Sequence, residues 1–520
     1  MMRRISAALA LAAAVWLTGS QARAEVKPHA LFSDGMVLQR GTNCPIWGTA
    51  DPGEEVKVEF RVIKPTSSHA SSGAAVAGRD GKWNITLPVD REMAGGPYEL
   101  TIKGKNAITL KDVYVGEVWV CSGQSNMEWP LSATENAKEA IENSTNLQIR
   151  LFTVPHNTPS KPVHDFKGDP KWQGCNPETV KRFSAVAYYF GSNLQKALEV
   201  PVGLIHTSWG GTRAEAWTSR PVLEQYEEWK WEFPAQEKFK PELDRYTEAV
   251  KKAKEEGKKP PTVPKSPVPT GANAPSVLYN GMIAPLIPYA IKGAIWYQGE
   301  SNAGKAYAYR KLFPTMIQNW RDDWKQGDFP FLFVQLAPYM KIESEPQESA
   351  WAELREAQLL TALHLKNSGM AVITDVGDPK DIHPKKKQPV GARLALAALA
   401  LGYDKNIEYS GPVYDQMRVQ DGKAVLSFTH VGKGLQAKDG PLNGFAIAGP
   451  DRKFYNARAE IQGDTVLVWS DQVTQPVAVR YGWASCPVVN LWNKDGLPAS
   501  PFRTDDFPTV TGPKPAKSSQ

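Results

Sequence analysis

Hydrophobic and polar residues alternate along short segments between residues 25 and 112. A period of two is clear in residues 56–60, 83–87 and 98–102, and turn-forming residues such as Gly95-Gly96-Pro97 separate these segments. Alternation of this kind is typical of strands that bury one face, and close turns join them into antiparallel sheets. We therefore expect an N-terminal β-sandwich-like domain over residues 25–112.

The pattern changes near residue 113, where apolar runs become nearly continuous and alternate with helix-like stretches. Strands that are apolar at every position are typical of a parallel sheet covered by helices on both faces. The sequence thus predicts an α/β domain over residues 113–403. Its expected strands lie at residues 113–121, 149–154, 202–206, 291–296, 331–336 and 370–374, with helices at 133–141, 180–197 and 391–401.

Other segments lie within or after this domain. Residues 224–275 are first charged and helix-prone and then rich in proline, which indicates a helical insertion with a stiff linker. Alternating apolar segments return after residue 404 and predict a C-terminal β-domain over 404–510. Residues 511–520 are polar, and we expect a disordered tail there.

The N-terminus has the features of an export signal. Arg3 and Arg4 precede an apolar run over residues 5–18, and Ala22-Arg23-Ala24 supplies small residues two positions apart. We expect a Sec-type signal peptide over residues 1–24 and a periplasmic or extracellular protein. No later stretch has the roughly 18 apolar residues of a membrane span.

Charge and cysteine content exclude some classes of partner. The net charge is +6 and falls to +3 without the leader, which gives little reason to expect nucleic acid as a partner. The lysines at 385–387 are interpreted as a solvated helix start. Four cysteines occur without a C-x-x-C pair, so thiolate metal sites are not expected and a disulfide pairing cannot be chosen. The sequence makes no prediction of oligomeric state.

The first candidate for chemistry is Ser125. The block Ser122-Gly123-Gln124-Ser125-Asn126-Met127 follows the first strand of the expected parallel sheet and precedes a helix-like segment. Such strand-to-helix turns lie at the carboxyl edge of the sheet, where open α/β domains bind ligands. A serine there acts as a nucleophile if a base is close. Alternatively, Ser125 only caps the following helix.

Three further blocks follow the carboxyl ends of other expected strands. These are Ser208-Trp209-Gly210-Gly211-Thr212, Trp296-Tyr297-Gln298-Gly299-Glu300-Ser301-Asn302 and Asp381-Ile382-His383-Pro384. Paired glycines allow close backbone approach, amides offer N–H donors to an oxyanion, and histidine is a general base. Because all four blocks meet at one sheet edge, they favour a catalytic serine over a helix cap.

These blocks resemble those of SGNH hydrolases, and most closely the sialate O-acetylesterase branch, which is related to acetylxylan esterases. The resemblance extends over nearly the whole chain after the leader. It includes Leu31-Phe32-Ser33-Asp34-Gly35-Met36, Leu278-Tyr279-Asn280-Gly281-Met282 and Asn490-Leu491-Trp492-Asn493-Lys494-Asp495-Gly496. It implies a flavodoxin-like SGNH domain with a parallel sheet, flanked by the two β-domains.

The resemblance also implies roles for site residues. Ser125 is the expected nucleophile and His383 its base. The oxyanion hole is expected from the N–H groups of Ser125 and Gly211 and the side-chain amide of Gln298, with Asn302 as a further donor. No metal or cofactor is expected.

The identity of the catalytic acid is open. Many SGNH enzymes carry the acid three residues before the histidine, where this chain has Lys380. Asp381 lies two residues before His383, and Asp378 lies five before it. We favour Asp381 because Asp-Ile-His-Pro matches the sialate-esterase branch as a unit, but Asp378 or a Ser–His dyad is the alternative.

The expected function is hydrolysis of acetyl esters on a carbohydrate, with O-acetylated sialic acid as the expected substrate. Contacts with the sugar are expected from residues close to the blocks, namely Trp129, Trp209, Arg213, Tyr297 and Glu300. Arg213 is the candidate for a sialic acid carboxylate. One alternative is an acetylxylan or polysaccharide deacetylase with the same mechanism, and another is a non-catalytic carbohydrate-binding protein. A lipase-type fold is disfavoured because no G-x-S-x-G motif occurs.

Overall fold

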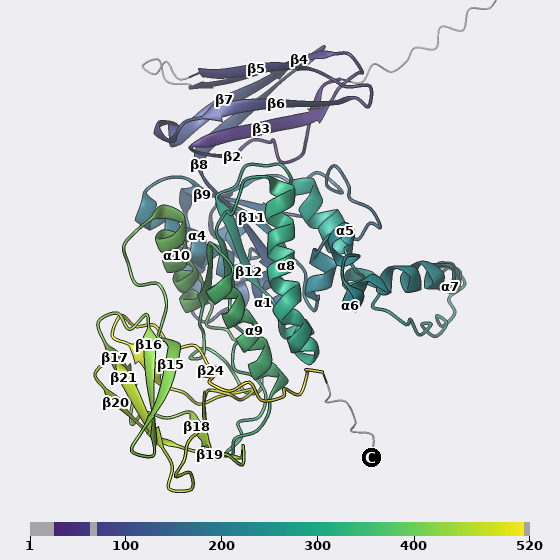
Figure 1. Ribbon diagram of the computed structural model, residues 1–520. Helices are drawn as coiled ribbons and strands as arrows, with labels where there is room; N and C mark the ends of the chain where they lie inside the picture. Colours follow the sequence, from purple (N-terminus) through teal and green to yellow (C-terminus); the bar gives the residue numbers. More distant parts are fainter. Residues whose placement is uncertain (1–24, 63–69, 514–520) are drawn as a thin grey trace, which may run out of the picture.

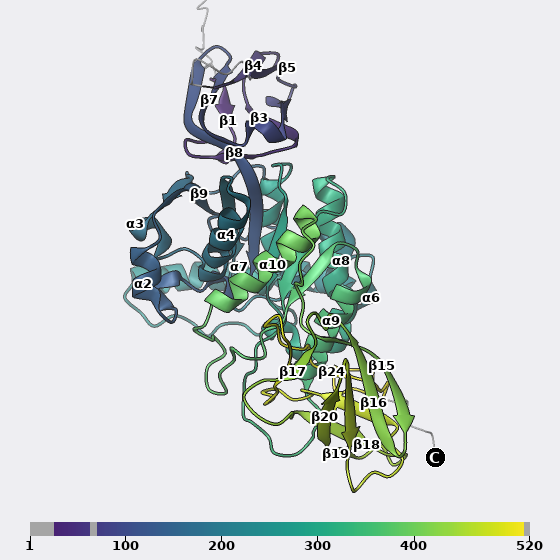
Figure 2. The same ribbon diagram turned by 90° about the vertical axis from the view of Figure 1, so that its left-hand side faces the viewer.

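The computed structural model describes residues 25–62 and 70–513 (Figure 1). The expected signal peptide, residues 1–24, and the end of the expected tail, residues 514–520, lie outside the described residues. Two β-rich parts lie at opposite ends of a central α/β part in both views (Figures 1 and 2). The carboxyl ends of the central strands face the C-terminal β-rich part.

The N-terminal part consists of sheets whose strands bury alternate residues. In β6 exposed and buried positions alternate over all eight residues, as the period of two predicts. One sheet has the order β1-β3-β6, and β4 pairs with β5 and β7 in the other. The bounds are β1 Lys27–Pro28, β2 Val37–Gln39, β3 Thr42–Thr49, β4 Glu55–Val62, β5 Ala70–Val76, β6 Lys82–Val89 and β7 Gly95–Lys103.

One long strand, β8 (Ala107–Gly123), joins the N-terminal part to the central sheet. It pairs with β7 over its first half, and its last seven residues pair with two central strands. Its burial changes at the same point, from alternating to complete over residues 115–123. The expected boundary between residues 112 and 113 therefore falls inside a continuous strand.

The central sheet has the order β10-β9-β11-β8-β12-β13-β14, and its strands from β9 to β14 pair in parallel. All six expected strands are present. Without the edge strands β10 and β9, the order is 2-1-3-4-5 in chain sequence, as in flavodoxin-like sheets. The bounds are β9 Asn146–Thr153, β10 Gln173–Cys175, β11 Val202–Ser208, β12 Gly293–Tyr297, β13 Phe331–Val334 and β14 Ser368–Ala371.

Helices cover both faces of this sheet. Trp119 and Cys121 of β8 belong to a core cluster with α4 (Ala185–Leu198) and α10 (Gln388–Tyr403), whereas Val118 and Val120 lie in a cluster with α8 (Ala306–Trp324) and α9 (Ala350–His364). The alternation along β8 thus divides its side chains between two cores. Shorter helices are α1 Ser125–Glu128, α2 Ala137–Glu142, α3 Pro177–Val180 and α5 Arg220–Leu223.

The expected insertion is helical and projects from the central part (Figure 1). It contains α6 (Glu227–Lys230) and α7 (Glu232–Glu255), and residues 258–270 after it form no helix or strand. Only the start of α7 is buried, at Glu232, Phe233 and Phe239.

The C-terminal part contains three small antiparallel sheets, with orders β15-β16-β21-β20, β17-β23 and β19-β18-β22-β24. Their bounds are β15 Val413–Gln420, β16 Lys423–Thr429, β17 Leu435–Ala437, β18 Phe445–Ala448, β19 Phe454–Asn456, β20 Arg458–Gln462, β21 Thr465–Trp469, β22 Ala478–Tyr481, β23 Leu491–Asn493 and β24 Phe502–Arg503.

The expected disordered tail begins with a residue, Thr511, that is bonded to the central part of the protein. The backbone N–H of Thr511 donates to the carboxylate of Glu353 at 3.1 Å, and the Thr511 hydroxyl bonds to the same carboxylate. Because Glu353 is buried, its carboxylate cannot bond to water, and the Thr511 donors supply the hydrogen bonds that it needs. Across residues 25–62 and 70–513, no helix is both long and apolar enough to cross a bilayer.

Candidate active site

The end of β8 forces the chain into a sharp turn before Ser125. Gly123 has φ +142°, and a Cβ atom there would lie 2.2 Å from the carbonyl oxygen of Tyr297. Only glycine fits this conformation and this contact. The N–H of Gln124 then donates to the Tyr297 carbonyl at 2.9 Å, and Ser125 begins α1 at the carboxyl edge of the sheet, half-buried.

His383 lies directly against Ser125. Its Nε2 is 2.8 Å from the Ser125 Oγ, a hydrogen-bond distance between two residues 258 positions apart. The indole of Trp129 stacks on the imidazole, with ring centroids 4.9 Å apart and planes 16° apart. The structure therefore brings the expected nucleophile and base together and holds the base against an aromatic face.

Asp381 contacts the backbone of His383 more closely than its ring. One carboxylate oxygen accepts the His383 N–H at 2.9 Å, while the distance from His383 Nδ1 to that oxygen is 3.8 Å. The second distance is too long for a hydrogen bond and becomes an ion-pair contact only when the imidazole is protonated. Asp378 accepts the N–H of Lys380 at 2.8 Å instead. Of the two candidate acids, only Asp381 has a described contact with His383.

A buried polar network lies behind Ser125 and His383. Asn126 donates to the Glu300 carboxylate at 2.7 Å and to the Ile382 carbonyl at 3.0 Å, and it accepts from the Lys387 ammonium. One amide thus ties the nucleophile helix to the histidine loop. Lys387 is 1% exposed, so the interpretation of its lysine run as solvated is wrong at this position, although Lys385 and Lys386 are exposed.

Burial and charge shift the titration of this region. Burial lowers the pKa of Lys387 to about 7 and raises the pKa of Glu300. The pKa of His383 is lowered, first by burial and then by the positive charge of Lys387, while the Asp381 carboxylate acts in the opposite direction. A lowered pKa keeps the imidazole of His383 neutral, which a general base requires.

The glycines after β11 reach the nucleophile. A Cβ atom on Gly210 would lie 3.3 Å from the Cβ of Ser125, so only glycine allows this approach without displacement. The N–H of Gly210 donates to the Glu128 carboxylate at 2.6 Å. The N–H groups of Gly211 and Ser125 have no acceptor among the described residues. Two unpaired N–H donors are therefore available at this site.

Gln298 and Asn302, expected as oxyanion donors, bond elsewhere in the structure. The Gln298 amide donates to the Thr212 carbonyl at 3.2 Å and to the Asn302 side chain at 2.7 Å, which uses both of its hydrogens. Asn302 donates to Glu215 at 2.9 Å and accepts the Ala214 N–H at 2.9 Å. Here both side chains brace the loop after β11, because every polar atom buried with them needs a partner.

Arg213 also differs from expectation. Its side chain is 8% exposed and forms an ion pair with Glu232, which is 1% exposed, at the start of α7. Its Nε donates to the Asn273 carbonyl at 2.8 Å. A guanidinium held in this way cannot turn outward to a sialic acid carboxylate. The sequence places Arg213 directly after the block that ends in Gly210-Gly211-Thr212, but its partner lies in the insertion.

The other expected sugar contacts divide between surface and interior. Trp129 and Trp209 are half-buried beside the site, whereas Tyr297 is fully buried and the Glu300 carboxylate is bonded to Asn126. Tyr297 and Glu300 are therefore not surface contacts in this structure, since β12 ends inside the core.

His156 was not singled out by sequence, yet it lies at the site. Its ring stacks on Trp209 with centroids 3.9 Å apart, and its Nε2 is 3.4 Å from the Glu128 carboxylate. The hydrogen bond to Glu128 raises the pKa of His156. The signal was its position, two residues after the expected strand at 149–154. No group of three or more His, Cys, Asp or Glu residues in the described part of the chain could hold a metal ion.

The chain is similar to known carbohydrate esterases over most of its length. Residues 115–265 and 271–400 match the family described as "Carbohydrate esterase, sialic acid-specific acetylesterase". Human sialate O-acetylesterase is 30% identical over 93% of this chain and 92% of its own length, and the mouse protein is 32% identical over 90% and 92%. A carbohydrate acetylesterase from Xanthomonas citri has 37% identity and a TM-score of 0.79, covering 93% of this chain and all of that one. The chain belongs to the carbohydrate esterase family of sialic acid-specific acetylesterases.

Proposed function

We propose that this protein is a carbohydrate O-acetylesterase that works through an acyl-serine intermediate on Ser125. The observation that carries the proposal is the 2.8 Å contact between Ser125 Oγ and His383 Nε2, beside two unpaired backbone N–H groups. A serine with an adjacent base and oxyanion donors has the parts that acyl transfer needs. We also propose that the central domain is of the SGNH type.

The reaction has two steps. His383 accepts the Ser125 proton as Oγ attacks the acetyl carbonyl, and the N–H groups of Ser125 and Gly211 stabilise the oxyanion. The C–O bond to the sugar breaks, and His383 returns the proton to the departing sugar alcohol. Water then attacks the acyl-serine with His383 as base, which releases acetate and restores the Ser125 hydroxyl.

Asp381 supports the base in this mechanism. Its bond to the His383 N–H fixes the loop, and its charge at 3.8 Å stabilises the imidazolium that forms during each step. This arrangement is a Ser–His pair assisted by a nearby carboxylate. Because the ring hydrogen bond of a full triad is replaced by a longer contact, the acid contributes through charge and loop position.

The substrate named for the family is O-acetylated sialic acid, and a cation at the site would favour binding of its carboxylate. Arg213 is committed to Glu232. The side chains of Glu128 and Asp381 are 36% and 42% exposed at the site, and both are negative. Like charges disfavour a carboxylate ligand. This charge pattern supports a second candidate, a neutral O-acetylated sugar such as that in acetylated xylan.

The wall formed by Trp209 and His156 suits either sugar. Aromatic faces contact the C–H surface of a sugar ring, and the two rings lie within 6° of parallel. His156 is 40% exposed, so its edge is available to a hydroxyl group. The signal peptide that the sequence predicts over residues 1–24 is consistent with this proposal, because an exported esterase would encounter extracellular glycans.

Acetate release tests the proposal. Replacement of Ser125 by alanine removes the nucleophile and is expected to abolish hydrolysis of p-nitrophenyl acetate, with the same outcome for His383→Ala. Unchanged hydrolysis in the Ser125→Ala variant would eliminate the acyl-serine mechanism and favour a carbohydrate-binding protein. Acetate release from O-acetylated sialic acid and from acetylated xylan, compared as kcat/KM, decides between the two substrates.

A further inference from the structure

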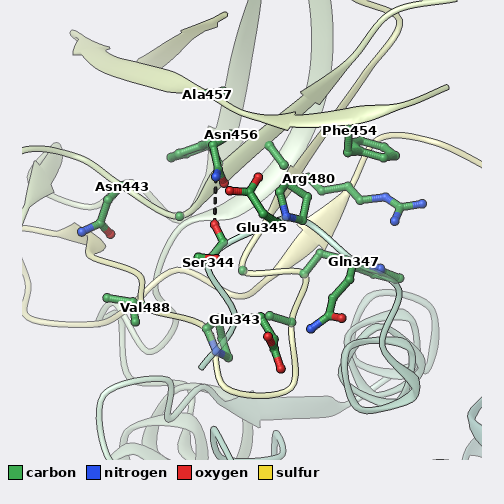
Figure 3. Close-up of a pocket in the computed structure, with 18 of the residues that line it drawn as sticks. Glu343, Ser344, Glu345, Gln347, Asn443, Phe454, Asn456, Ala457, Arg480 and Val488 are labelled. Atoms are coloured by element: carbon green, nitrogen blue, oxygen red, sulfur yellow. Dashed lines mark hydrogen bonds between the residues drawn. The ribbon is translucent and has the colours of Figure 1, made fainter. Parts of the chain in front are cut away.

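A large pocket lies away from Ser125, at the C-terminal β-rich part (Figure 3). Its volume is about 680 Å³. One wall is formed by residues 343–348, which connect β13 to α9, and the opposite wall comes from β18, β19 and residues 480–488. None of its lining residues belongs to the four blocks at the catalytic edge, so the pocket is separate from the esterase site.

The wall formed by residues 343–348 is fixed across the pocket. The Asn456 amide donates to the Ser344 carbonyl at 2.9 Å, a bond that spans the two walls in Figure 3. Gln347 and Asn443 are exposed at the pocket, and their side-chain amides have no partner among the described residues. Glu345 is likewise exposed there. The pocket therefore offers uncommitted amide and carboxylate groups on a braced frame.

An aromatic and guanidinium layer forms another side. Arg480 is 3% exposed and forms ion pairs with Asp505 at 2.8 Å and Glu348 at 2.7 Å. Its guanidinium lies 4.1 Å from the ring centroid of Phe454 and 5.0 Å from that of Trp483. Because two carboxylates neutralise Arg480, its guanidinium is rigid and is not free to bind an anion. Arg452 and Lys453 also line the pocket, and their charged groups lie over the rings of Phe507 and Tyr455.

Most of the residues that line the pocket belong to the C-terminal β-rich part. Both views place the C-terminal part below the carboxyl ends of the central strands (Figures 1 and 2). The pocket wall also contacts the esterase part, since Arg355 of α9 donates to the carbonyls of Ala484 and Ser485 at 2.7 Å and 2.8 Å. Burial raises the pKa of Cys486 in this wall, and the carboxylate of Asp378, five residues before His383, adds to the increase.

We propose that this pocket binds an uncharged run of sugar rings in the same glycan whose acetyl group reacts at Ser125. Hydroxyl groups both donate and accept, so they pair with side-chain amides and carboxylates, and sugar C–H faces pack on aromatic rings. A volume of about 680 Å³ lies within the range of small-molecule sites and accommodates more than one ring. The inference rests on the proposed function, since it assigns the glycan by the reaction at Ser125.

The first test uses the full chain with Gln347→Ala and Asn443→Ala combined. Loss of two hydrogen-bonding side chains is expected to lower kcat/KM on acetylated xylan about tenfold, mainly through KM. Hydrolysis of p-nitrophenyl acetate, which reaches only Ser125, is expected to stay within about twofold. Asn143→Ala is the control, because Asn143 is an exposed amide that lines a different, smaller hollow.

The second test measures binding without turnover. Xylohexaose is titrated into the Ser125→Ala chain by NMR, with and without the two pocket substitutions, and the substitutions are expected to weaken binding about tenfold. Equal binding by both chains, no binding by either, or an equal loss of activity on both esters would overturn the pocket assignment. Hydrolysis that survives Ser125→Ala would instead overturn the proposed function, so the two failures are distinct.

Discussion

Replacing Lys387 by methionine removes a buried positive charge beside the catalytic pair and keeps a side chain of similar length. Lys387 is 1% exposed, donates to Asn126, and lies 5.3 Å from the ring centroid of Tyr297. Two results are expected from this change. The chain becomes more stable at acidic pH, and the pKa of His383 rises.

The gain in stability follows from the titration of Lys387. Its pKa falls from 10.5 to about 7 on folding, so the buried charge costs the folded chain about 5 kcal/mol below pH 7. Loss of the hydrogen bond to Asn126 and of the positive charge that faces the buried Glu300 carboxylate together offset about 1–3 kcal/mol. We expect the free energy of unfolding to increase by about 2–4 kcal/mol in the Lys387→Met chain below pH 7. The gain fades from pH 7 to 10.5, where the lysine of the unfolded chain also loses its proton.

The catalytic effect has a definite sign. Lys387 is protonated at the pH where His383 titrates, and its charge lowers the pKa of His383. Without that charge the pKa of His383 rises, so a larger fraction of the imidazole is protonated, and inactive as a base, at a given acidic pH. The acid limb of kcat/KM for p-nitrophenyl acetate is expected to move to higher pH by about half a unit.

The assay pairs this variant with Lys386→Met. Lys386 precedes Lys387 but is exposed, so water and salt screen its charge and the limb is expected to shift by less than about 0.2 unit. Urea unfolding at acidic and alkaline pH and the pH dependence of kcat/KM are measured on both chains. If the acid limb of the Lys387→Met chain coincides with that of the Lys386→Met chain, or moves to lower pH, the reasoning is refuted. A loss of stability below pH 7 would also refute it.

Three further predictions concern the site. Gly210→Ala adds a Cβ atom 3.3 Å from the Cβ of Ser125 and is expected to lower kcat about tenfold or more with little change in Tm. Asp381→Asn removes a charge that raises the pKa of His383, so the acid limb of kcat/KM is expected to shift to lower pH, and an unchanged limb would exclude Asp381 as the acid. Arg213→Met leaves buried carboxylates unpaired and is expected to cost about 3–5 kcal/mol of stability, measured by thermal unfolding; an unchanged Tm would contradict this.

Much of the site was predictable because parallel strands end at one edge. The apolar runs identified β8, β11 and β12, and the residues directly after them include Ser125, Gly210 and Gly211. His156 belongs to the same rule, since it follows the end of β9, but no neighbouring motif drew attention to it. Residues that directly follow the predicted parallel strands could thus be assigned to the same edge of the sheet.

Partner choice was not predictable. Gln298, Asn302 and Arg213 are residue types that bind oxyanions or carboxylates, and each stands in a block at the catalytic edge. Their hydrogen bonds go to Thr212, Glu215 and Glu232 instead. A side chain at a sheet edge can point to ligand or to protein, and local sequence does not distinguish the two.

The sequence by itself determined the order of β and α/β parts, the edge where the blocks meet and the membership of Ser125 and His383 in one site. These follow from side-chain period and strand direction, which are local properties. Only the tertiary structure decided that Lys387 is buried, that Asp381 approaches His383 at 3.8 Å, and that residues 343–348 enclose a pocket. Burial and distance depend on segments far apart in the chain, so they arise only when the fold brings those segments together.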